Sequence, residues 1–189
     1  MGGESSNCGP GRFDLEDLGL LIGSTEREYD IITRNAGMLL HTSAAMFCVL
    51  DEGQSSVFVR SRFMPRCRDL LPDRFDRDGS MFARMIEKSE PVRLIDLSEH
   101  HEYEGSFEPS VIPFKSVLSS PVYGPARETI GALVVLCSIP RRWSDLEQQE
   151  LADLAHLVSR HVMLRASLET LKRMSREREA LFDVPRFRN

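Results

Sequence analysis

The segment 130–137, with the sequence IGALVVLC, constrains the fold more than any other part of the chain because nearly all its side chains are apolar. A strand of this kind is buried on both faces, so we expect it near the centre of a sheet. The segment 117–123 reads as a second strand, and Gly124 and Pro125 form the turn between the two. The chain must therefore cover both faces of a β-sheet.

Two more strands are predicted upstream. Segments 44–50 and 56–63 are rich in residues that favour strands, and the turn between them contains Gly53. This pattern is typical of an antiparallel hairpin. Residues 91–96 are predicted to form another short strand.

A short helix and a long loop complete the middle of the chain. Ser80 can cap a helix whose apolar residues, Met81, Phe82, Met85 and Ile86, share one face. Residues 97–115 form a polar segment with two prolines. A loop of this length inside a compact domain is usually a lid over a binding site or a disordered excursion.

Long amphipathic helices are predicted at both ends. From residue 13, apolar residues recur at spacings of three and four, and the stripe consists of Leu15, Leu18, Ile22, Tyr29, Ile32, Ala36 and Leu39, with a weak point at Thr25. Ser144 and Glu147 resemble a capping box that opens a second helix running beyond Ser175. Its seam, formed by Leu157, His161, Leu164, Leu168 and Leu171, has the spacing of a coiled coil.

These elements predict an α+β fold. We expect an antiparallel β-sheet with the long N- and C-terminal helices on one face and the short helix with the lid loop on the other. The expected organisation is a flexible tail over residues 1–12, one domain over 13–164, and a helical extension and tail over 165–189. A ligand pocket is expected on the face of the lid.

Charge and cysteine content disfavour several classes of function. The formal net charge of −5 disfavours a nucleic-acid partner, and no apolar run is long enough to span a membrane, so we expect a cytoplasmic protein. The four cysteines lack the spacing of a zinc site or a thioredoxin-like pair. His100 and His101 can ligate a metal, but adjacent loop residues rarely converge on one ion, so a solvated loop is favoured and no metal is predicted.

Four stretches of the chain, at residues 86–96, 116–122, 129–135 and 143–151, resemble the GAF domain, a small-molecule-sensing module of signalling proteins. Residues 86–96 resemble its helix, turn and strand ending in Asp, and residues 116–122 resemble its S-x-L-x-x-P-L strand. Residues 129–135 are similar to its x-x-G-v-L strand, and residues 143–151 to the entry into its last helix. Each match is weak alone, but together they span residues 15–164 in the family's order.

The resemblance does not extend to the family's known ligand classes. Domains that bind cyclic nucleotides have an Asn-Lys pair, a Phe and an Asp-Glu pair around the last helix, of which only Trp143 and Glu147 have counterparts here. The chain has no cysteine between Cys67 and Cys137 to which a bilin could be linked. The closely grouped cysteines of GAF-fold methionine-R-sulfoxide reductases are also missing.

Candidate binding residues follow from these placements. For ligand binding we name Phe82, Met85, Asp96, His100, Tyr103, Phe114, Ser119 and Cys137. Ligand pockets are mostly apolar with a few polar groups, but the apolar members also suit ordinary core packing. Asp96 suits either ligand binding or capping of the lid backbone. Cys137 also suits a small buried hydrophobic residue.

A homodimer is predicted through the terminal helices. Its interface residues are expected to be Leu18, Ile22, Tyr29, Leu157, His161, Leu164, Leu168 and Leu171. The resemblance implies a non-catalytic sensory or regulatory domain that binds a small molecule or partner protein, with no catalytic residues and no identified cofactor. The output would be a kinase, a cyclase or a transcription regulator. Two alternatives remain open: a structural dimerisation module with a filled pocket, and an enzyme of an unrecognised kind.

Overall fold

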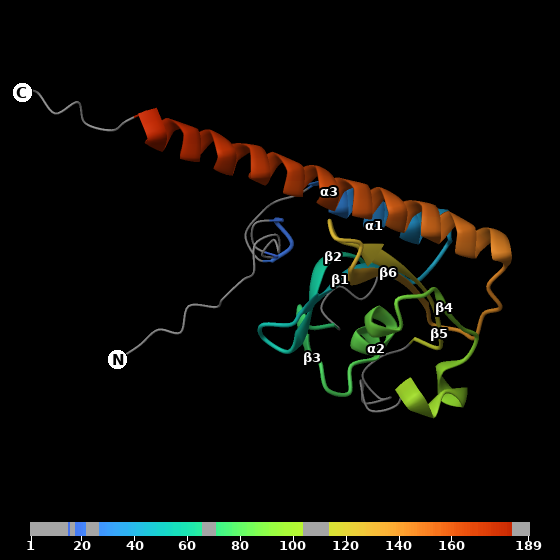
Figure 1. Cartoon of the computed structure of the whole chain (residues 1–189). Helices are drawn as coiled ribbons and strands as arrows, with labels where there is room; N and C mark the ends of the chain where they lie inside the picture. The colour runs from blue at the N-terminus through green and yellow to red at the C-terminus, as the bar shows by residue number, and fades with distance from the viewer. Residues whose placement is uncertain (1–14, 16–17, 22–26, 66–70, 104–113, 183–189) are drawn as a thin grey trace, which may run out of the picture.

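The computed structural model describes residue 15 and residues 18–21, 27–65, 71–103 and 114–182 (Figure 1). The helices and strands are α1 (Arg27–Leu39), β1 (Ala44–Asp51), β2 (Ser56–Phe63), β3 (Arg74–Asp76), α2 (Met81–Lys88), β4 (Val92–Leu94), the 3-10 turns η1 (Leu97–Glu99) and η2 (His101–Tyr103), β5 (Ser116–Tyr123), β6 (Thr129–Cys137) and α3 (Asp145–Phe182). The α+β class is therefore confirmed. Within these residues, no helix is long and apolar enough to cross a membrane.

One antiparallel sheet joins all six strands in the order β3-β2-β1-β6-β5-β4. The hairpin of β1 and β2 and the central position of β6 confirm the predictions. β6 packs closely against β1 because residue 131 is glycine: a Cβ atom there would lie 2.3 Å from the Cys48 carbonyl oxygen. Pro121 lies beyond the end of β4, which pairs only with residues 117–119 of β5, so its missing N–H breaks no bond between these strands.

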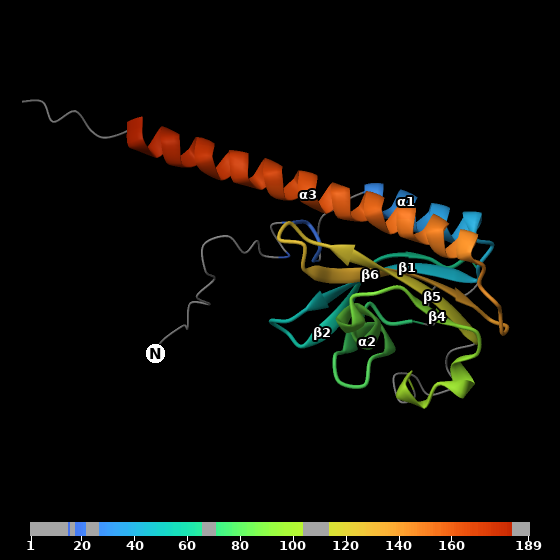
Figure 2. The same ribbon diagram turned by 45° about the vertical axis from the view of Figure 1, so that its right-hand side comes forward.

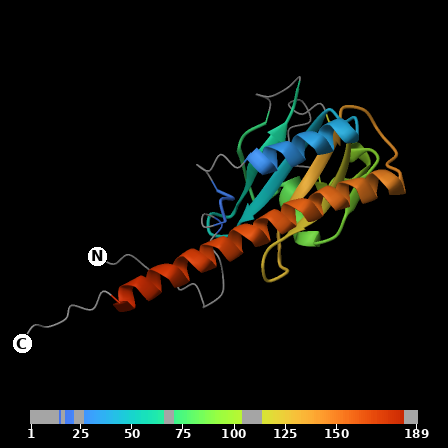
Figure 3. The ribbon, with the colours of Figure 1, turned by 90° about the horizontal axis from the view of Figure 1, so that it is seen from above.

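The sheet separates two hydrophobic cores. One core contains α2 and the strand residues that point toward it, such as Met46 and Val134. The other contains α1, α3 and the alternate residues, such as Phe47 and Val135. The two long helices run side by side over one face, and α2 covers the other (Figures 2 and 3).

The N-terminal helix is shorter than predicted. α1 begins at Arg27, and residues 18–21 are not helical because Gly19 has a φ of 67°, which ends any regular helix at this point. Leu18 and Leu20 are instead completely buried against the core beneath α1 and α3. The spacing of Leu15 and Leu18 therefore arises because both residues pack against the core, and it does not indicate a helix. Ile22 and Thr25 lie outside the described residues.

Both predicted helix caps are present. The Ser80 hydroxyl accepts a hydrogen bond from the Ala83 N–H at 3.3 Å. At the start of α3, the Glu147 N–H donates to the Ser144 hydroxyl at 3.2 Å, and the Ser144 N–H donates to Glu147 Oε2 at 2.7 Å. This is a reciprocal capping box.

α3 extends well beyond the sheet (Figure 1). It has 38 residues, and Ala166 is the last of its described side chains that is buried. The remainder therefore depends on its own helical bonds or on another molecule for support.

Candidate functional site

Four of the predicted ligand-binding residues meet on the α2 face of the sheet. Phe82 and Met85 of α2, Tyr103 of η2 and Phe114 belong to one buried cluster together with Cys48 of β1. Their exposed fractions are all 7% or less. The Tyr103 hydroxyl is buried without a hydrogen-bond partner in the described parts of the chain. A ligand on this face would therefore meet an apolar wall with one unsatisfied polar group.

Ser119 contributes from the sheet itself. It lies on β5 between Val92 of β4 and Val134 of β6, and it is almost completely buried. Strand alternation places its side chain on the same face as Val117, which packs in the α2 core. Five of the eight predicted residues are thus brought to one face.

Asp96 acts as a cap of the turn that follows β4. Its carboxylate accepts hydrogen bonds from the Ser98 hydroxyl at 2.7 Å and the Ser98 N–H at 3.0 Å. The Ser98 hydroxyl, followed by the Ser98 N–H, lowers the pKa of Asp96 below its usual value. Of the two roles considered for Asp96, ligand binding and capping of the lid backbone, the structure shows the cap. His100 follows in the next turn, with its ring 6.4 Å from that of Tyr103.

Cys137 is not part of this cluster. It lies in the core beneath α1 and α3, on the opposite face of the sheet. The expectation that it joins the ligand residues is wrong because alternation along β6 turns Ala132, Val134 and Leu136 toward α2 and Cys137 away from it.

The described thiols do not form a reactive pair. Cys48 and Cys137 are separated by the sheet, and complete burial raises the pKa of Cys48 to about 12. Such a thiol has almost no thiolate at neutral pH. Cys8 and Cys67 lie outside the described residues. Among the described residues, no group of three His, Cys, Asp or Glu side chains is placed to hold a metal ion.

Hydrogen bonds connect β4 with the start of α3. The Trp143 indole N–H donates to the Leu94 carbonyl at 3.2 Å, and the Arg141 N–H donates to the Ile95 carbonyl at 3.1 Å. In return, the Arg93 guanidinium donates to the Trp143 carbonyl at 3.1 Å and to Asp145 at 2.9 Å. We call these residues, 93–95 and 141–145, the β4–α3 junction. Sequence reasoning missed it because no local pattern reveals contacts 50 residues apart.

Arg141 extends this junction to α1. Its guanidinium donates to the Leu40 carbonyl at 2.8 Å, forms an ion pair with Glu147, and lies 4.5 Å from the centre of the Trp143 ring. One side chain therefore contacts the end of α1 and the first turn of α3.

The predicted dimer residues divide into two groups. Leu157, Leu164, Leu168 and Leu171 of α3 are between 42% and 63% exposed, so they form an unpartnered apolar stripe. Leu18 and Tyr29 are completely buried in the chain's own core, which corrects their assignment because they have no surface left for a partner. Ile22 lies outside the described residues.

His161 lies between these groups. Its ring stands perpendicular to that of Tyr29, with ring centres 5.0 Å apart. It also lines a shallow groove of about 460 Å³ between α1 and α3, together with Ile31, Leu157 and Leu164.

Solved structures of low sequence identity share this fold. The GAF domain of a phosphoenolpyruvate-protein phosphotransferase from Acinetobacter has a TM-score of 0.63 and 17% identity, covering 80% of this chain and 91% of that one. The free methionine-R-sulfoxide reductase of Neisseria meningitidis, solved with its substrate, has a TM-score of 0.60 and 13% identity, covering 80% and 87%. The PixJ GAF domain of Thermosynechococcus elongatus, in a blue-light-absorbing form, has a TM-score of 0.59 and 12% identity, covering 80% and 90%.

The sequence itself supports the same family. No curated protein matches the chain. The model of the GAF domain matches residues 24–162, which include every described strand and helix from α1 to the middle of α3. The chain therefore belongs to the GAF domain family.

Proposed function

We propose that this chain is a non-catalytic sensory or regulatory domain that works as a homodimer. It binds a small molecule or a partner on the α2 face of the sheet and passes the change to α3. The photoreceptor domains among its structural neighbours support a sensory role. The buried and unsatisfied Tyr103 hydroxyl supports a ligand on this face.

The β4–α3 junction carries this proposal. β4 leads directly into the turns that hold Asp96, His100 and Tyr103, next to the proposed ligand. Its backbone carbonyls at Leu94 and Ile95 accept bonds from Trp143 and Arg141 just before α3 begins. A ligand that moves β4 therefore changes the position of the first turn of α3. Packed interfaces have discrete arrangements, so a small displacement can select between two states of a dimer.

The exposed stripe on α3 supports the homodimer. Leu157, Leu164, Leu168 and Leu171 follow the spacing of a two-stranded coiled coil, and His161 lies on the same line. In the dimer the two α3 helices pack along this stripe and deliver the change to an output protein. We propose a kinase, a cyclase or a transcription regulator in that role.

Native mass spectrometry of the protein purified from its own host tests the proposal. The expected result is a dimer that retains a small molecule, and replacement of Tyr103 by phenylalanine should reduce the retained fraction. A dimer without any bound molecule would support the alternative of a structural dimerisation module. A monomer at micromolar concentration would contradict the helical interface.

An assay tests the enzymatic alternative, which the reductases among the structural neighbours raise. The chain is incubated with free methionine-R-sulfoxide and a dithiol reductant. We expect no turnover above the reductant alone, because Cys48 and Cys137 lie on opposite faces of the sheet and burial suppresses the Cys48 thiolate. Turnover that disappears in a variant lacking Cys67 would contradict the non-catalytic role.

A further inference from the structure

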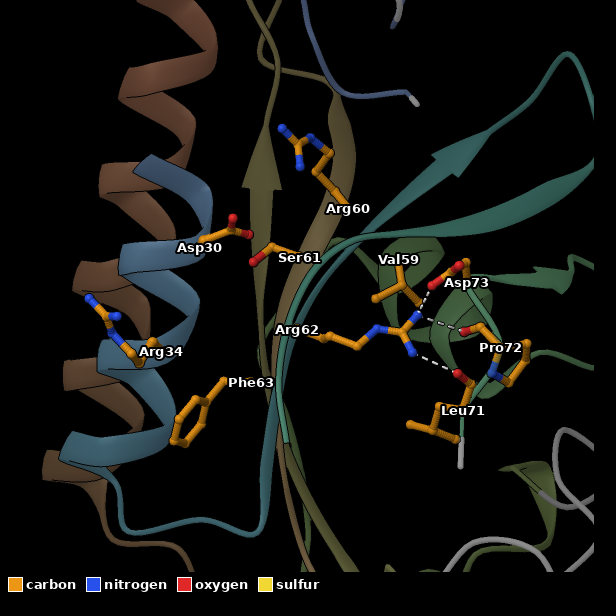
Figure 4. A pocket seen from close by; sticks show the side chains of 10 residues that line it. All are labelled: Asp30, Arg34, Val59, Arg60, Ser61, Arg62, Phe63, Leu71, Pro72 and Asp73. Carbon is orange, nitrogen blue, oxygen red and sulfur yellow. Dashed lines mark hydrogen bonds and ion pairs between the residues drawn. The ribbon is translucent and has the colours of Figure 1, made fainter. Parts of the chain in front are cut away.

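A second cavity lies at the outer edge of β2 and is lined by residues from α1, from β2 and from the segment 71–73 (Figure 4). Its volume is about 810 Å³, which is within the range of small-molecule sites. The residues that line it are Asp30, Arg34, Val59, Arg60, Ser61, Arg62, Phe63, Leu71, Pro72 and Asp73. None of the eight predicted ligand-binding residues is among them. We call this cavity the β2-edge groove.

The groove exists because β3 covers only part of β2. β3 pairs with residues 56–58, and the Val59 N–H still donates to the Asp73 carbonyl at 2.8 Å. The register of β2 against β1 then shifts at Arg60, which is a β-bulge. Beyond the bulge, no described strand pairs with the outer edge of β2. The groove lies along this part of the β2 edge.

Ser61 marks the groove as a place for a polar ligand. Its side chain points from β2 toward α1, beside Asp30 (Figure 4). The residue is only 4% exposed, and its hydroxyl has no hydrogen-bond partner among the residues that the structure describes. A buried hydroxyl without a partner is costly, so a ligand or a bound water that pairs with it stabilises the protein.

Two arginines of the groove already form hydrogen bonds with other parts of the chain. The Arg62 guanidinium is held by the carbonyls of Leu71, at 2.6 Å, and Pro72, at 3.2 Å, and by the Asp73 carboxylate. Arg60 donates to the Gly19 carbonyl at 2.9 Å and stacks over the Tyr29 ring. Both arginines therefore help to build the wall.

Asp30 and Arg34 have no hydrogen bond or ion pair of their own in the described part of the structure. They are four residues apart on α1, a spacing at which opposite charges commonly pair. Here their side chains diverge, with Asp30 directed toward Ser61 and Arg34 turned away from it (Figure 4). Burial lowers the pKa of Arg60 and the Asp30 carboxylate opposes this shift, so Asp30 also interacts electrostatically with Arg60. Besides the engaged Arg60, Arg62 and Asp73, the groove presents the Asp30 carboxylate, the Arg34 guanidinium and the buried Ser61 hydroxyl.

We propose that the β2-edge groove binds a free α-amino acid. Its ammonium pairs with Asp30, its carboxylate pairs with Arg34, and the Ser61 hydroxyl bonds to either group. Residues at this helical spacing have Cβ atoms about 5–6 Å apart, so the Arg34 side chain, which is turned away from Ser61 in this structure, must swing toward Asp30 to pair with the carboxylate of the same molecule (Figure 4). Phe63, which lies on the same side of β2 as Asp30 and Arg34, offers an apolar contact to its side chain (Figure 4).

The test is a thermal-shift screen of the whole chain with each standard L-amino acid at about 10 mM, which reveals a Kd of about 1 mM as a measurable stabilisation. Hits are then titrated by calorimetry and located by amide chemical-shift changes in 15N-labelled protein. We expect the shifts to centre on Ser61 and on α1 between Asp30 and Arg34. Shifts centred on Phe82 and Tyr103 would overturn this proposal while supporting the proposed function, so the two can fail separately.

Variants and ligand analogues sharpen the test. Asp30→Asn and Arg34→Gln are each expected to weaken binding by about tenfold or more, since each removes a charge-assisted hydrogen bond. Arg27→Gln is the matched control, because Arg27 is an exposed arginine of α1 outside the groove. The amine and the carboxylic acid that correspond to the best amino acid should both bind at least tenfold more weakly.

Three outcomes would overturn the proposal. They are the absence of any saturable binding, equal binding by the carboxylic acid alone, and affinities of D30N and R34Q that match that of R27Q.

Discussion

At the scale of single residues, Gly131 lies opposite Val49 where β6 pairs with β1. Gly131→Ala would place a Cβ atom 2.3 Å from the Cys48 carbonyl oxygen, so the two strands must separate. We expect the free energy of unfolding to fall by roughly 1–3 kcal/mol, as for other overpacked interiors. Urea denaturation followed by circular dichroism measures the change.

Gly53→Ala is the matched control for this substitution. Gly53 lies in the turn of the hairpin, and its nearest neighbour to an added Cβ atom is an Asp51 side-chain oxygen at 3.5 Å, an ordinary contact. Equal losses in the two variants would show that the close approach at Gly131 is not the cause.

Tyr29 predicts how stability depends on alkaline pH. Burial raises its pKa from the ordinary value of 10.0 to about 12, although the nearby Arg60 opposes this shift. The unfolded chain therefore loses the phenolic proton at lower pH than the folded chain does. Stability from this residue is fully present below about pH 10 and declines as the pH rises toward 12, by on the order of 2 kcal/mol.

The variant Tyr29→Phe tests this dependence. Its free energy of unfolding should be within about 1 kcal/mol of the wild type at pH 7, because the Tyr29 hydroxyl has no hydrogen-bond partner within the described residues. Between pH 10 and 12 the variant should lose less stability than the wild type. Parallel curves for the two proteins over that range would contradict the raised pKa.

At the scale of elements, the capping box fixes where α3 begins. Ser144→Ala removes the acceptor of the Glu147 N–H, and we expect a loss of about 1 kcal/mol in the free energy of unfolding. Ser167→Ala in the same helix is the control, since the Ser167 hydroxyl only bonds back to the Met163 carbonyl. Chemical denaturation of both variants gives the comparison, and a larger loss for the control would reject the cap as the stronger contribution.

Sequence patterns predicted the structural features that are formed by residues close together in the chain. The capping box of α3, the cap of α2 and the hairpin all depend on residues that are close in sequence, and all three are confirmed. β3 was missed because Arg74–Asp76 is a three-residue, partly exposed edge strand with no apolar alternation. The prediction that the first helix begins near residue 13 was wrong, because the leucines of residues 18–21 are buried without forming a helix.

The candidate site was predictable only in part, for a related reason. Helical spacing and the position of the lid placed Phe82, Met85 and Tyr103 together, and they do lie in one buried cluster, while their role in ligand binding stays a prediction. Cys137 was misplaced because a strand that is apolar on both faces gives no alternation to read. The β2-edge groove escaped prediction entirely, since it depends on how α1 lies against a bulge in β2.

At the scale of the whole molecule, the exposed stripe of α3 predicts the oligomeric state. Leu164→Lys places a charge on the stripe and should convert the proposed dimer into a monomer, as measured by sedimentation velocity at micromolar concentration. Met163→Lys is the matched control, because Met163 is adjacent and similarly exposed, at 49% against 55% for Leu164, but lies off the stripe. Dissociation by both variants, or by neither, would contradict an interface along the stripe.

The sheet that separates the two cores also affects how such a domain can change during evolution. Side chains that would contact a ligand lie on the α2 face, whereas the leucines that would hold the dimer together are exposed on α3, over the opposite face of the sheet (Figure 2). Substitutions at distant sites without shared partners have nearly additive effects on stability. Recognition can therefore be altered on one face while assembly is preserved on the other, and only the residues of the β4–α3 junction must remain compatible with both.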